Sequence, residues 1–172
     1  MSHIVMLRGP TGVGKSALAR GLARCPQFRL EYLLYDRFLF VDRHLRESVD
    51  LIAEMGAVGR LSMNLLNQGN RDIITEECFR DQPMIEAFLK GSGLTLSDPR
   101  LVVVRLTATT ETLEERAAHS GRPELTPEVA RTQLDAPYFP IPNELLVATD
   151  GKSEEETLSA TVNLLRDRIC EY

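Results

Sequence analysis

Short apolar runs alternate with stretches of helical spacing along this 172-residue chain. Runs rich in aliphatic or aromatic residues predict strands at residues 4–7, 28–35, 72–75, 101–106 and 144–148. The run from Leu101 to Leu106 is predominantly aliphatic, which is typical of a strand buried on both faces.

The segments between these runs have apolar residues at helical spacing. They predict helices after Ser16, over residues 37–57, over 61–68, after Pro83, over 110–119, from Thr126 and from Ser153. Gly56 and Gly59 indicate a break between the second and third of these helices. Ser153 and Glu156 have the spacing of a capping box.

Strands that alternate with helices predict an α/β fold in which helices cover both faces of a five-stranded parallel sheet. Ligands of such sheets bind at the carboxyl ends of the strands. Residues that follow the strands are therefore the candidates for chemistry.

Composition supports one domain spanning residues 1–172. Hydrophobic residues make up 43% and charged residues 26%, which suits a soluble globular chain. The sequence predicts neither a membrane span nor a signal peptide, so we expect the cytosol. Three widely spaced cysteines indicate no disulfide framework. The net charge of −5 gives no general attraction for nucleic acid and favours small acceptors.

The most informative motif follows the first predicted strand. Gly9, Pro10, Thr11, Gly12, Val13, Gly14, Lys15 and Ser16 match G-x-x-x-x-G-K-[ST], the phosphate-binding P-loop. Its glycines let backbone amides surround a phosphate, Lys15 is expected to reach the β- and γ-phosphates, and Ser16 to bind Mg²⁺. The sequence therefore predicts a site for a nucleoside triphosphate, with MgATP as the expected cofactor.

Acidic residues follow the second and third predicted strands. Asp36 is the candidate general base for an acceptor hydroxyl, with Asp42 as its competitor and a turn or helix cap as the alternative role. Glu76 is a candidate for holding Mg²⁺ through a water molecule or for orienting the acceptor, with a solvated strand end as the alternative role. Glu77 is equally eligible by spacing, but adjacent residues of a strand point to opposite faces.

Two arginines bracket the corner after the fourth predicted strand. Guanidinium groups of Arg116 and Arg122 could stabilise charge that develops on a γ-phosphate during transfer. The alternative for Arg116 is a surface position on a helix. Closure of such a corner would exclude water from the site.

The P-loop, Asp36, the Leu113-x-x-Arg116 sequence and Gly121-Arg122 together make the chain similar to small P-loop kinases. This group includes adenylate-kinase-like, gluconate-kinase-like, chloramphenicol-phosphotransferase-like and polynucleotide-kinase-like enzymes. The resemblance implies a three-layer P-loop fold with strand order 2-3-1-4-5 and a small helical lid at about residues 110–135 that carries both arginines. It also implies that Asp36 deprotonates or orients the acceptor hydroxyl.

The sequence-based hypothesis is an ATP-dependent kinase that phosphorylates a hydroxyl of a nucleoside, a sugar or an antibiotic-like molecule. One alternative is a kinase of nucleic-acid 5′-hydroxyl ends, although Leu39 stands where polynucleotide kinases of this group usually have an arginine. Another is a P-loop ATPase that acts as a switch, because a P-loop identifies a ligand and not a reaction. The sequence predicts no oligomeric state.

Overall fold

The computed structural model describes residues 1–33, 51–69, 71–121, 125–135 and 137–169. Within these residues five parallel strands form one sheet in the order β2-β3-β1-β4-β5, which confirms the predicted topology. The strands are β1 (Ile4–Arg8), β2 (Leu30–Tyr32), β3 (Asp72–Glu76), β4 (Leu101–Thr107) and β5 (Leu145–Ala148).

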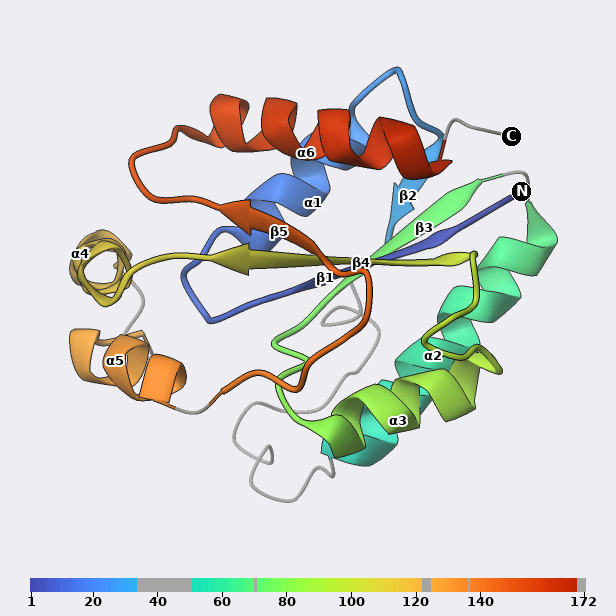
Figure 1. Ribbon diagram of the computed structural model, residues 1–172, viewed down its shortest axis with the longest axis horizontal. Helices are drawn as coiled ribbons and strands as arrows, with labels where there is room; N and C mark the ends of the chain where they lie inside the picture. Colours follow the sequence, from blue (N-terminus) through green and yellow to red (C-terminus); the bar gives the residue numbers. More distant parts are fainter. Residues whose placement is uncertain (34–50, 70, 122–124, 136, 170–172) are drawn as a thin grey trace.

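Helices cover both faces of the sheet and its carboxyl edge (Figure 1). They are α1 (Lys15–Ala23), α2 (Leu51–Gln68), α3 (Gln82–Ser92), α4 (Thr110–His119), α5 (Pro127–Asp135) and α6 (Glu154–Ile169). Helices α1 and α6 lie on one face, and α2 and α3 lie on the other. Helices α4 and α5 lie beyond the carboxyl ends of the strands, where they border the predicted site.

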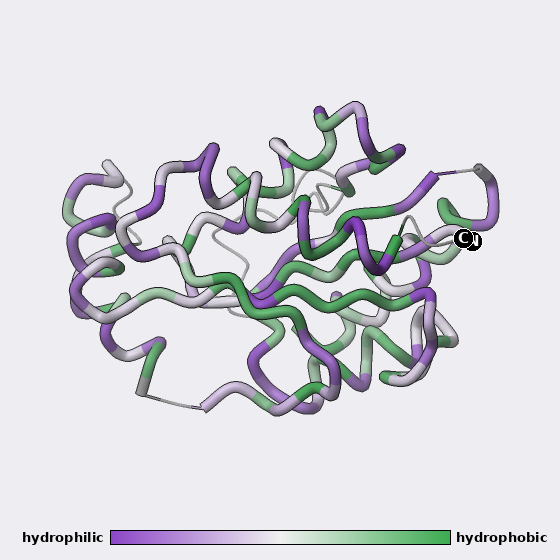
Figure 2. The backbone as a smooth tube through the Cα atoms, turned by 45° about the horizontal axis from the view of Figure 1, so that its top comes forward, coloured by the Kyte–Doolittle hydropathy of each residue, from purple (hydrophilic) through white to green (hydrophobic). Residues whose placement is uncertain are grey.

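Alternation along β1 divides the core into two halves. Val5 and Leu7 join the cluster under α1 and α6, while Ile4 and Met6 join the cluster under α2 and α3. All four are fully buried, as expected for a central parallel strand. Figure 2 shows the resulting concentration of hydrophobic residues in the central strands.

The predicted break near Gly56 and Gly59 is wrong, because α2 runs unbroken from Leu51 to Gln68. Its glycines allow a close approach to α3. A Cβ atom on Gly59 would lie 2.2 Å from the carbonyl oxygen of Phe88, and one on Gly91 would lie 2.1 Å from that of Gly56. Packing of the two helices thus outweighs the low helix propensity of glycine, which costs about 1 kcal/mol per residue relative to alanine.

Caps fix the helices beside the carboxyl edge. The Thr109 hydroxyl accepts a hydrogen bond from the amide of Thr112 and begins α4. At α6 the Glu156 amide donates to the Ser153 hydroxyl, and the Ser153 amide donates to the Glu156 carboxylate, which confirms the capping box. None of the described helices is long and apolar enough to cross a membrane.

Candidate nucleotide-binding site

The loop between β1 and α1 has the backbone geometry of a phosphate-binding loop. Gly9, Gly12 and Gly14 have φ angles of +144°, +84° and +106°, which L-residues with side chains rarely adopt. Gly14 is the N-cap of α1, and because it has no side chain the first amides of the helix have no side-chain cap. Such a helix start favours an anion, since its N–H groups and its dipole both face the ligand.

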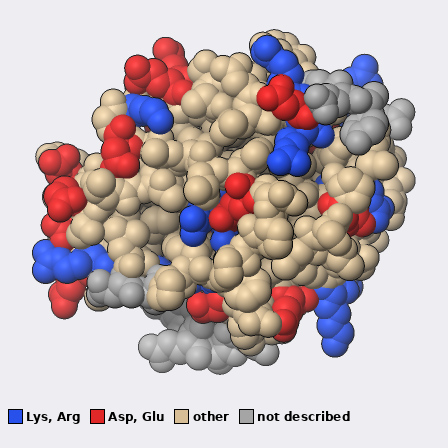
Figure 3. Space-filling view, viewed as in Figure 1, with Lys and Arg blue, Asp and Glu red and all other residues tan. Residues whose placement is uncertain are grey.

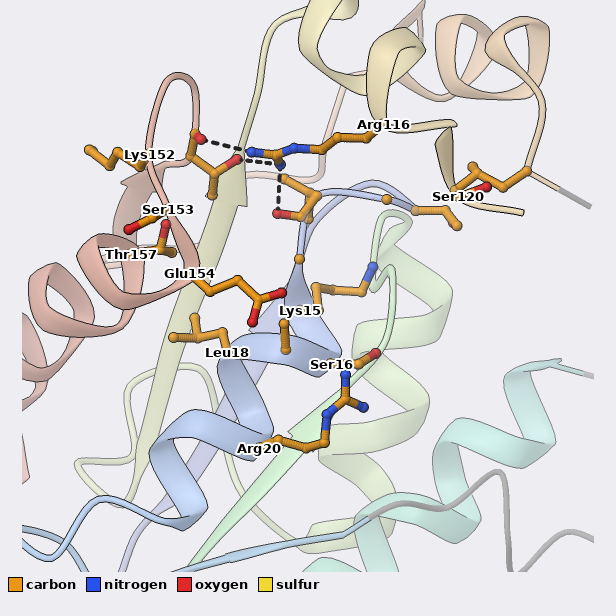
Figure 4. A pocket seen from close by; sticks show the side chains of 17 residues that line it. Lys15, Ser16, Leu18, Arg20, Arg116, Ser120, Lys152, Ser153, Glu154 and Thr157 are labelled. Carbon is orange, nitrogen blue, oxygen red and sulfur yellow. Dashed lines mark hydrogen bonds between the residues drawn. The ribbon is translucent and has the colours of Figure 1, made fainter. Parts of the chain in front are cut away.

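Lys15 and Ser16 begin α1 at the edge of a cavity (Figure 4). The Lys15 ammonium donates to the carbonyl oxygens of Gly9 at 2.9 Å and Pro10 at 3.0 Å. It therefore lies against the beginning of the loop, and Lys15 also belongs to the cavity lining.

The cavity beside the loop has a volume of about 610 Å³, which falls within the ordinary range for small-molecule sites. Its floor is the stretch from Thr11 to Leu18. Its walls come from Arg20, Arg116, Ser120, Leu125, Thr149, Lys152, Ser153, Glu154 and Thr157. Figure 4 shows Ser153, Glu154 and Thr157 near Lys15 and Leu18, so the starts of α6 and α1 both border the cavity.

Arg116 reaches from α4 across the cavity wall (Figure 4). Its guanidinium donates to the Val13 carbonyl oxygen at 3.2 Å, and to the Thr149 hydroxyl and carbonyl oxygens at 3.0 and 2.9 Å. The side chain thus links the P-loop to the segment between β5 and α6. The structure brings Arg116 to the predicted site; its action on a γ-phosphate stays a prediction.

Glu76 ends β3 next to β1, and its carboxylate accepts a hydrogen bond from the Tyr32 hydroxyl. Burial is the main reason that the pKa of Tyr32 is raised, and the Glu76 carboxylate adds to the rise while Ser16 and Arg20 oppose it. Tyr32 therefore lies close to both Glu76 and Ser16, the two residues predicted to serve Mg²⁺. The neighbouring Glu77 accepts instead from the Cys78 amide at 2.7 Å.

Three predicted residues, Asp36, Asp42 and Arg122, lie outside the described residues. The structure accordingly brings together the P-loop, Glu76 and Arg116 at one edge of the sheet. The contributions of the other three stay predictions.

A group of charged residues, the arginine cluster, adjoins the beginning of the loop; of its arginines Arg8 is buried, and Arg80 and Arg105 are partly exposed. It comprises Arg8, Arg80 and Arg105 around the ring of Tyr138, at 5.4, 5.4 and 5.7 Å from its centroid, together with Glu144. Arg8 and Arg105 are neighbours on β1 and β4, and both pair with the Glu144 carboxylate. Each ring–arginine contact is a cation–π interaction.

Arg8 ends β1 and has no exposed surface. Besides pairing with Glu144, its guanidinium donates to the carbonyl oxygens of Phe79 at 3.0 Å and Phe139 at 2.7 Å. These bonds tie the loop after β3 and the segment before β5 to the residue that directly precedes Gly9. The cluster thereby holds in place the backbone at which the P-loop begins.

Two other groups near the loop have shifted pKa values. Burial raises the pKa of the Tyr138 phenol to about 12, so the phenol stays protonated at neutral pH. Burial also raises the pKa of the Cys78 thiol, against a lowering by Lys15. Cys78 Sγ lies 3.8 Å from the Thr11 hydroxyl.

Figure 3 shows charges of both signs on one face of the molecule and no large patch of a single sign.

These features fit a magnesium-bound nucleoside triphosphate. Uncapped helix amides, glycines at positive φ and a lysine offer the donors that phosphates accept from. The Ser16 hydroxyl and the Glu76 carboxylate are oxygen ligands, the type that Mg²⁺ prefers. The lining between α4 and α6 leaves room for the nucleoside.

Sequence reasoning did not find Arg8, Tyr32 or Gln133, whose side chain contacts Thr11. For Arg8 a signal existed, because an arginine ends an otherwise apolar run directly before the P-loop. Tyr32 and Gln133 meet the site only through long-range packing, so nothing in their local sequence marks them.

No family model matches the chain, and no curated protein matches it in sequence. Among solved structures it is similar to a sugar kinase from Janibacter sp. HTCC2649, with a TM-score of 0.69, 15% identity and 98% and 96% of the two chains covered. It is also similar to a gluconokinase from Sinorhizobium meliloti 1021, with a TM-score of 0.62, 16% identity and 96% and 94% of the two chains covered. A tunicamycin resistance protein from Deinococcus radiodurans has a TM-score of 0.62 and 16% identity, with 96% of each chain covered. At these identities the likeness establishes the fold, the P-loop kinase-like arrangement of sheet and helices.

Proposed function

We propose that the chain is an ATP-dependent kinase that transfers the γ-phosphoryl group of ATP to a hydroxyl of a small molecule. The P-loop carries the proposal, because Gly14, Lys15 and Ser16 form an uncapped helix start at the floor of a nucleotide-sized cavity. Similarity in fold to a sugar kinase and a gluconokinase supports a small acceptor.

In the proposed reaction the acceptor oxygen forms a bond to the γ-phosphorus while the bond to the β–γ bridging oxygen breaks and ADP leaves. Asp36 takes the hydroxyl proton. Lys15 offsets the negative charge of the phosphates, and Ser16 and, through a water molecule, Glu76 would hold an Mg²⁺ ion that would offset more of it. Arg116 and Arg122 contribute positive charge from the lid, so rate enhancement comes from positioning and charge stabilisation.

The proposal is tested by phosphorus NMR of the protein with MgATP and pooled acceptors. The pool contains nucleosides, sugars, sugar acids, aminoglycoside- and chloramphenicol-type antibiotics, and 5′-hydroxyl oligonucleotides. We expect a phosphoester signal of a small acceptor, with an equal amount of ADP, and no signal with Lys15→Ala. ADP and free phosphate without any phosphoester would contradict a kinase and indicate an ATPase. A phosphoester on the oligonucleotide alone would indicate the nucleic-acid kinase.

The role of Asp36 is tested in the same assay. Asp36→Asn should still bind MgATP, because the proposed phosphate-binding groups are those of the P-loop, and should lose at least about a hundredfold in transfer rate. Asp42→Asn is the matched comparison and should retain transfer. Near-normal transfer by the Asp36 variant would show that another group accepts the proton.

A further inference from the structure

The side chain of Gln133, on α5, makes two hydrogen bonds to one residue of the P-loop. Thr11 N donates to Gln133 Oε1 at 2.5 Å, and Gln133 Nε2 donates to the Thr11 hydroxyl at 3.0 Å. Because one bond uses the carbonyl and the other the amino group, the pair fixes which way the carboxamide faces. Nε2 therefore points to the hydroxyl of Thr11.

Gln133 is also held through its backbone. Arg80, from the loop after β3, donates to the Gln133 carbonyl oxygen. Arg131 on the same helix pairs with Glu114 of α4 at 2.7 Å. Helix α5 is thus tied to α4 and to the loop after β3, so the carboxamide is presented to the P-loop from a supported position.

Thr11 lies at the end of the P-loop that a γ-phosphate would approach. The Lys15 ammonium, which in P-loops reaches the β- and γ-phosphates, lies on the carbonyl oxygens of Gly9 and Pro10, the two residues before Thr11. The amides at the α1 start, which suit the β-phosphate, lie at the other end of the loop. Thr11 also belongs to the cavity lining.

We propose that Gln133 is a positioning residue that gives the site its preference for a nucleoside triphosphate over a diphosphate. It fixes Thr11 at the γ-phosphate end of the loop and adds no charge of its own there. By holding both the amide and the hydroxyl of Thr11, the carboxamide sets the geometry of the loop residue that a γ-phosphate would approach. This inference rests on the proposed nucleotide binding.

The test compares the affinities of a non-hydrolysable MgATP analogue and of MgADP by calorimetry. Gln133→Glu keeps the shape of the side chain and an acceptor for the Thr11 amide, but places a carboxylate at the γ-phosphate end. Repulsion between like charges should weaken binding of the triphosphate analogue about tenfold or more, and binding of MgADP by less than about threefold. Gln133→Met, which is neutral and of similar volume, should lower the ratio of the two affinities in the same direction.

Gln68→Glu is the matched control, because it makes the same change of charge at an exposed residue at the end of α2, far from α5 (Figure 1). It should leave both affinities unchanged. If the Gln133 variants weaken both nucleotides equally, or neither, Gln133 is a structural contact only and the inference is overturned while the proposed function stands. If the wild-type protein binds neither nucleotide, both the proposed function and this inference are wrong.

Discussion

Arg8 and Glu144 form an ion pair inside the protein, directly before the first glycine of the P-loop. Their side chains are 0% and 7% exposed, and the Arg8 Nε donates to the Glu144 carboxylate. The same carboxylate pairs with Arg105. One acid thereby offsets two cations from adjacent strands, which makes it the residue on which the arginine cluster depends.

Glu144→Ala should destabilise the fold strongly. Removing one partner leaves a buried guanidinium without its counter-charge, which costs about 3 to 5 kcal/mol of the free energy of unfolding. Urea denaturation measures this loss. Asp167→Ala, at an exposed acid of α6, is the control and should change stability by about 0.5 kcal/mol or less. A loss for Glu144→Ala as small as that of the control would contradict the role given to the pair.

Alanine at Gly9 should be more harmful than alanine at Gly14. Both glycines have positive φ, so either substitution costs about 1 to 2 kcal/mol in backbone strain. A Cβ atom at Gly9 would also lie 2.5 Å from the Leu106 carbonyl oxygen, whereas one at Gly14 has no neighbour within 4 Å. Overpacking should add about 1 to 3 kcal/mol at Gly9. Thermal unfolding compares the two variants, and equal losses would show that the contact with β4 is unimportant.

Stability near the cavity should depend on pH through Asp150. Its carboxylate accepts from the Thr109 amide at 2.7 Å, and this bond is the main cause that lowers its pKa. A lowered pKa in the folded state contributes stability that is present above the unfolded-state value, about 3.9, and is lost as the pH falls through the folded-state value. Wild type should therefore melt at a higher temperature than Asp150→Asn near neutral pH, and the difference should vanish in strong acid. A difference that is the same at every pH would contradict this assignment.

Glu76, and not Glu77, should govern the response to Mg²⁺. Glu76 is close to Tyr32, which also approaches Ser16, whereas the Glu77 carboxylate accepts from the Cys78 amide. Glu76→Gln should raise the Mg²⁺ concentration needed for half-maximal ATP binding by about tenfold. Glu77→Gln retains an oxygen for the Cys78 amide and should leave that concentration unchanged. The reverse result would move the metal site to the other acid.

Much of the fold is readable from the sequence because local signals and global packing agree there. The start of α4 and the capping box of α6 follow from side chains within a few residues of each helix start. At Gly56 the local signal and the packing conflict. Glycine disfavours a helix in isolation, but here it lets α2 approach α3, and packing prevails.

Only the contiguous part of the site could be predicted from the sequence. The P-loop is contiguous, so its eight residues carry their own evidence. Gln133 and Thr11 are 122 positions apart and meet only once α5 has packed against α4. Arg105 interrupts an aliphatic strand, but nothing in the local sequence reveals that its partner is Glu144.

We propose above all that a nucleoside triphosphate binds at the P-loop and in the cavity bordered by α1, α4 and α6. A titration of isotope-labelled protein with MgATP, followed through its amide NMR signals, tests it most directly. We expect the largest shifts at Gly12, Gly14, Lys15 and Ser16, smaller shifts at Thr149 and Ser153, and none of them in Lys15→Ala. No shifts at the P-loop, or shifts that persist unchanged in the Lys15 variant, would show that the triphosphate does not bind there.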